Sequence, residues 1–169
     1  MEEKREESKN IEKYNIYHKA FTLMNLAKQE KNLPYSIASI AIAESIIADR
    51  TLSYISFKEK EWYERNNNKY INTASLIDKC NKYFKKYAVR INRKDSSIYE
   101  TKDLFQDLKN WLNKRNTVLH SFAKSKPGTK TMTVEEFSEL AIETSEEGLE
   151  LVSLTKKWFA QQKRKTKIK

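Results

Sequence analysis

The sequence predicts an all-α fold, an antiparallel bundle of about five helices in a single domain. The 169 residues include only two glycines and two prolines, too few for the tight turns of a many-stranded sheet or for a phosphate-binding loop. Apolar residues instead recur at helical spacing along most of the chain. No long apolar run interrupts a composition that is 33% charged, which excludes a helical membrane span.

The first two expected helices cover residues 3–31 and 35–60. Tyr14, Tyr17 and Phe21 share one face of the first, while residues 1–10 are polar all round and are expected to fray. Pro34 is typical of a first helical turn, so the chain should reverse near residue 33.

The second helix is the most apolar. Its main stripe comprises Ile37, Ile40, Ala41, Ile47, Ala48 and Ile55. Ile42 and Ile46 lie on the opposite side, and a helix with two apolar faces either is central in its bundle or covers a dimer contact.

The remaining helices are expected at residues 70–90, 101–123 and from 133 onward. The first of these carries Tyr70, Ile77 and Cys80 on one stripe, with Cys80 as an inert core residue. Residues 92–99 form a polar connection. The last helix begins with a capping box, Thr133 and Glu136, and residues 163–169 form a basic tail expected to fray.

Two charged residues occupy apolar stripes. Stepping about 100° per residue puts Arg115 amid Leu108, Trp111 and Val118. The same construction puts Glu44 in the middle of the stripe of the second helix. An unpaired buried charge costs several kcal/mol, so each needs a partner. Either the two residues form a structural ion pair, which helical geometry alone favours, or they belong to a polar site between helices, which we favour once His120 is considered.

His120 lies on the same helix as Arg115, but about 140° away around the axis. One helix cannot easily direct both side chains at one small substrate. Two copies that face each other across a two-fold axis could do so.

The run Arg115-Asn116-Thr117-Val118-Leu119-His120 resembles the R-N-x-x-x-H form of the R-x4–6-H motif of HEPN domains. In that family the motif lies late in an all-helical bundle, and an acidic residue on an earlier helix often joins it, the position that Glu44 fits. The resemblance covers nearly the whole chain. Residues 1–169 are therefore expected to form a single HEPN-like domain.

The resemblance implies a metal-independent endoribonuclease, without a cofactor, that acts as a homodimer with a composite cleft. Cleavage would leave a 2′,3′-cyclic phosphate and a 5′-OH. His120 suits proton transfer, and Arg115 suits stabilisation of the phosphorane. Asn116 could orient the phosphate or the imidazole, and Glu44 could hold Arg115 or tune His120. A non-catalytic module that binds RNA, a nucleotide or a protein partner remains the alternative, as does a structural dimer.

The family also includes toxins and phage-defence effectors, so an antitoxin or defence-system partner is a further expectation. In one toxin branch a Tyr two residues after the His accepts AMP. Phe122 occupies that position here, which argues against neutralisation by AMPylation.

The net charge of +10 favours a polyanionic partner such as RNA. Candidate phosphate contacts are Arg50, Lys114 and Lys124. The polar, charged start of the chain does not resemble a signal peptide, and with a single cysteine the expected location is cytoplasmic.

Overall fold

The fold of the chain is helical. It is seen in a computed structural model that describes residues 2–66, 69–84, 91–92, 98–99, 101–121 and 132–167. The described elements, in chain order, are α1 (Glu2–Glu30), α2 (Leu33–Lys58), α3 (Lys60–Asn66), α4 (Thr73–Phe84), β1 (Ile91–Asn92), β2 (Ile98–Tyr99), α5 (Thr101–Ser121) and α6 (Val134–Lys167).

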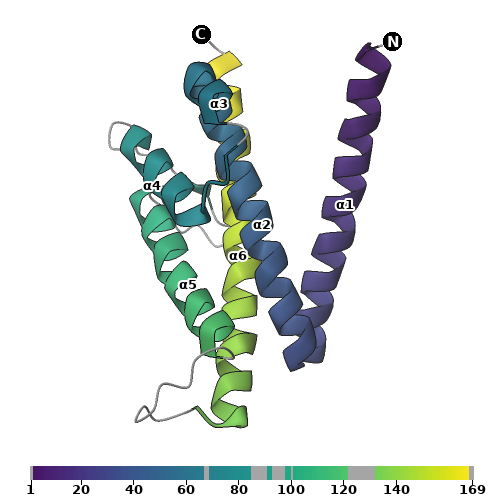
Figure 1. Cartoon of the computed structure of the whole chain (residues 1–169), viewed down its shortest axis with the longest axis vertical. Coiled ribbons are helices and arrows are strands. Elements are labelled where there is room, and N and C mark those ends of the chain that lie inside the picture. Colours follow the sequence, from purple (N-terminus) through teal and green to yellow (C-terminus); the bar gives the residue numbers. More distant parts are fainter. Residues whose placement is uncertain are drawn as a thin grey trace.

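Helices α2 and α6 make the central contact of the bundle. Helices α4 and α5 lie on one side of this pair and α1 on the other, and α1 diverges from the bundle toward the amino terminus (Figure 1). α1 runs opposite to α2 and α5 opposite to α6, but α2 and α6 run in the same direction. The predicted antiparallel arrangement therefore holds for these chain neighbours and is wrong for the central pair.

The described part of the chain contains six helices instead of about five. The additional helix, α3, arises because the chain leaves helical geometry at Glu59 (φ −136°, ψ 74°), whose N–H still donates to the Ile55 carbonyl. The predicted polar connection at 92–99 is partly β structure, because Ile91 pairs with Tyr99 and Asn92 with Ile98 in an antiparallel ladder.

Several predicted boundaries also change. Tyr70 is 94% exposed and precedes α4, because Asn72 caps that helix by accepting a hydrogen bond from the Ser75 N–H at 2.8 Å. α1 begins at Glu2, close to the predicted start at residue 3, and α6 continues to Lys167. Two other helix starts are confirmed: the Asn32 side chain caps α2 with Pro34 in its first turn, and Thr133 and Glu136 form the capping box of α6.

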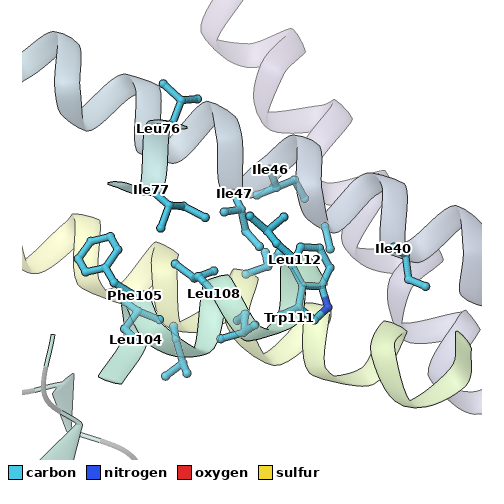
Figure 2. Packing of buried hydrophobic residues seen from close by; sticks show 14 of the residues in the cluster. Ile40, Ile46, Ile47, Leu76, Ile77, Leu104, Phe105, Leu108, Trp111 and Leu112 are labelled. Atoms are coloured by element: carbon cyan, nitrogen blue, oxygen red, sulfur yellow. The ribbon is translucent and has the colours of Figure 1, made fainter. Parts of the chain in front are cut away.

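A single apolar core joins α2, α4, α5 and α6. Figure 2 shows Ile47 of α2, Ile77 of α4 and Leu108 of α5 pointing toward one another; each is at most 1% exposed. Cys80 is fully buried, as predicted, and its thiol donates to the Thr51 carbonyl at 3.8 Å. Burial raises the pKa of Cys80 to about 12, so the thiol stays protonated and unreactive near neutral pH. No described helix combines the length and the apolar composition that a membrane crossing requires.

The buried face of α2 differs from the predicted stripe by roughly a quarter of a turn. Ala41, placed on the stripe, is exposed. The true face includes small residues that the sequence analysis passed over: Ser36, Ser39 and Ala43, all 0% exposed. Small side chains lie there because α6 packs closely against this face. The opposite apolar face packs partly against α1, with Ile46 4% exposed and Ile42 partly buried. Because α2 contacts α1, α4 and α6, it is central in its bundle.

Gly148 of α6 marks the point of closest packing. A Cβ atom at this position would lie 3.0 Å from Cζ2 of Trp111 and 3.1 Å from Cβ of Ala43. The Trp111 indole is 1% exposed and donates its N–H to the Thr144 carbonyl at 2.8 Å. Trp111 cannot move away easily because its indole is hydrogen-bonded in the core. Ala43 cannot do so either, because its methyl group is attached directly to the α2 backbone.

We therefore predict that Gly148→Ala lowers the free energy of unfolding by about 1–2 kcal/mol. Overpacking should outweigh the gain of about 1 kcal/mol that alanine brings to a helix interior. Urea unfolding followed by circular dichroism measures the difference. A variant more stable than the wild type would show that α6 does not pack this closely against Trp111 and Ala43.

Candidate functional site

Arg115 of α5 is the centre of the candidate site. Its flanking residues on the core face, Leu108, Trp111 and Val118, are at most 1% exposed, so the predicted mid-stripe position of the cation is confirmed. The arginine side chain is 21% exposed. It lies between buried residues of α5, and the charge is held there by polar partners from two elements.

Glu44 of α2 is the principal partner. Its Oε2 accepts a hydrogen bond from Nη2 of Arg115, and the two side chains form an ion pair across the bundle. Its other oxygen, Oε1, accepts from the Thr73 hydroxyl at 3.0 Å. Glu44 is 20% exposed. It lies at the edge of the buried face of α2, whereas the sequence predicts a position in the middle of that face. The carboxylate therefore bridges the first residue of α4 and the arginine of α5.

Asn116 completes the network, because its Oδ1 accepts a hydrogen bond from Nη1 of Arg115. A guanidinium group has five N–H donors. Two of them are used by Glu44 and Asn116. The Nε group is buried and has no hydrogen-bond partner among the described residues, which leaves two Nη donors for a ligand.

A polar cavity of about 500 Å³ opens next to this network, between the start of α4 and one face of α5. Its lining contains Glu44, Arg115 and Asn116 together with further polar side chains: Asn72, Thr73, Asp78, Lys109 and Asn113. Lys109 pairs with Asp78 through one of its three N–H donors, and Arg115 retains two Nη donors beyond those its partners use. An anionic group that enters the cavity can be contacted by those donors.

His120 is exposed on α5 and is not part of the cavity lining. The structure of one chain thus brings Glu44, Arg115 and Asn116 together. His120 lies outside the lining, one turn beyond Asn116 on the same side of α5 and about 140° around the axis from Arg115, as the helical spacing predicts.

Arg50 and Lys114, two of the three candidate phosphate contacts, lie away from the cavity. The guanidinium of Arg50 is 5.0 Å from the centre of the Tyr17 ring, next to α1. The Lys114 ammonium donates to Glu143 and Glu147 of α6 at 2.8 and 2.7 Å, and these hydrogen bonds raise its pKa. Neither residue lines the cavity. Lys124 and Phe122 lie outside the described residues.

Thr73, Lys109 and Asn113 are cavity residues that the sequence analysis did not identify. Thr73 was missed because the helix was expected to begin at residue 70, which placed this threonine inside an ordinary helical segment. The asparagine at 72, a preferred N-cap type, was the signal that could have put Thr73 in the first turn of α4.

Within the described part of the chain, no three His, Cys, Asp or Glu side chains are arranged as a metal site. The chain was also compared with known proteins, and no family model, no curated protein and no solved structure matches it.

We predict that Glu44 and Arg115 are energetically coupled. Each single substitution to alanine should lower the free energy of unfolding by roughly 1–3 kcal/mol, because it leaves the other charge largely buried without its partner. The double variant should lose less than the sum of the two. Urea unfolding of all four proteins measures the coupling.

The Lys109–Asp78 pair provides a matched control at the same cavity, with side chains 38% and 53% exposed. Lys109→Ala and Asp78→Ala should change stability by about 1 kcal/mol at most. Additive losses at Glu44 and Arg115, equal to those of this exposed pair, would contradict a coupled buried pair.

Proposed function

We propose that this protein is a metal-independent endoribonuclease of the HEPN type. The observation that carries the proposal is the arginine of the R-N-x-x-x-H run, anchored by Glu44 and Asn116 at the wall of a polar cavity with two Nη donors to spare. A partly buried, oriented guanidinium is suited to charge that develops on a phosphorane, since it needs no reorganisation during the reaction.

The reaction that fits these residues uses the 2′-OH of RNA as the nucleophile. His120 removes the proton from this hydroxyl or protonates the 5′-oxygen as the P–O5′ bond breaks. Arg115 neutralises the equatorial oxygens, Asn116 orients the phosphate, and Glu44 keeps the guanidinium in place. The products are a 2′,3′-cyclic phosphate and a 5′-OH. Because the nucleophile belongs to the substrate, this route requires no metal-bound water.

The proposed enzyme acts as a homodimer. Arg115 lines the cavity, whereas His120 is exposed and outside the lining, and the two side chains leave the helix about 140° apart, which favours a site shared between two chains. A second α5 related by a two-fold axis places the histidine of one copy near the arginine of the other. A role as a toxin or a phage-defence effector, controlled by a protein partner, is part of the same proposal and is supported by the family resemblance of the motif.

We predict that His120→Ala lowers the rate of RNA cleavage in EDTA by about 10²- to 10⁴-fold. Arg115→Lys should also be poor, because an ammonium lacks the planar donor fork, whereas Asn116→Ala should lose less. The assay follows a labelled single-stranded RNA and identifies the cyclic phosphate end.

His18→Ala is the matched control, because it removes the other histidine, which is exposed on α1, and should leave the rate unchanged. Full activity of His120→Ala, or loss of wild-type activity in EDTA, would contradict the chemistry. RNA binding without cleavage by the wild type would instead identify a non-catalytic module.

We further predict a dimer at micromolar concentration, which sedimentation equilibrium measures. Arg115→Ala mixed with His120→Ala should regain part of the lost cleavage, because a mixed dimer contains one site with both residues intact. A monomer that cleaves RNA at the full rate would refute the composite site.

A further inference from the structure

We propose that Thr73 is a positioning residue for Arg115: its hydroxyl holds the Glu44 carboxylate so that only one carboxylate oxygen engages the guanidinium. The proposal rests on the proposed ribonuclease function for its catalytic consequence. Its structural content, the orientation of Glu44 and Arg115, can be tested without any cleavage assay.

The position of Thr73 separates it from ordinary helix capping. Asn72 provides the cap of α4, through its side-chain oxygen to Ser75 N–H at 2.8 Å and its carbonyl to Leu76 N–H at 3.2 Å. The Thr73 hydroxyl is therefore not needed to start the helix. It donates instead to Glu44 Oε1 at 3.0 Å, across 29 residues of sequence.

Burial makes this hydrogen bond specific. Thr73 is 6% exposed, so little water can replace its hydroxyl, and a charge-assisted bond in such surroundings is stronger than one in solvent. The first turn of α4 also favours a negative charge near it, because its unpaired N–H groups carry a partial positive charge. Oε1 of Glu44 is thereby held on the α4 side, away from Arg115.

The consequence concerns the free donors of the arginine. A carboxylate without another partner commonly accepts hydrogen bonds from a guanidinium through both of its oxygens. With Oε1 held by Thr73, Glu44 engages Arg115 through Oε2 alone. A second contact, if it formed end-on, would occupy one of the two remaining Nη donors. Thr73 thus keeps Arg115 anchored and still able to bind an anion.

The test compares Thr73→Val, which keeps the shape and removes the donor, with Thr73→Ser, which keeps the donor. Thr51→Val is the matched control, since Thr51 is 3% exposed and its hydroxyl bonds to the Ile47 carbonyl of its own helix. Nitrogen-15 NMR of the arginine side chains reports on Arg115 in each protein, with the resonance assigned by Arg115→Lys. Thermal melts check that all the variants fold.

Thr73→Val should shift the Arg115 guanidinium resonances, and Thr73→Ser and Thr51→Val should leave them in place. In RNA cleavage, kcat/KM of Thr73→Val should fall by roughly 10- to 100-fold, with recovery in Thr73→Ser. Unchanged Arg115 resonances in a folded Thr73→Val protein would overturn the proposal whatever the activity. If the wild type cleaves no RNA, the ribonuclease function fails, and the NMR comparison still decides whether Thr73 positions Arg115.

Discussion

The candidate site depends on one constraint: a guanidinium group placed in the apolar face of α5. Removing a cation from water without partners costs several kcal/mol, so the surrounding helices have to supply polar groups at that depth. Glu44 of α2 contacts Arg115, and Thr73 of α4 contacts Glu44 in turn. The network fixes how α2, α4 and α5 meet, because each of the three provides at least one member.

The close packing of α2 on α6 makes this meeting possible. Ala43 and Gly148 let the two helices approach, and this contact sets the rotation of α2 about its axis. That rotation places Glu44 at the edge of the buried face, where its carboxylate reaches the cavity and Arg115 together. With α2 turned so that Ala41 was buried, as the sequence analysis expected, Glu44 would lie deeper and farther from solvent.

The helical class, the mid-stripe position of Arg115 and its pairing with Glu44 could all be predicted from spacing, because a 3.6-residue period determines which side chains share a face. The rotation of α2 could not, since hydrophobic size favours isoleucines whereas the actual contact is made by small residues such as Ser39 and Ala43. The parallel course of α2 and α6 depends on connections that helical periodicity does not encode. The role of Thr73 was missed for a further reason. Thr73 and Glu44 are 29 residues apart in the sequence, and a local pattern of residue types does not show such a contact.

Trp111 gives the site an optical property. Its indole lies on α5 one turn before Arg115, 1% exposed, with its N–H held by the Thr144 carbonyl and its ring against the Gly148 position. An indole in such surroundings emits at shorter wavelength than one in water. Any rotation of α5 that carries Arg115 out of the cavity must also pull this ring from its carbonyl acceptor, so in a chain where Trp62 and Trp158 are replaced by phenylalanine the remaining indole fluorescence reports on the orientation of the arginine.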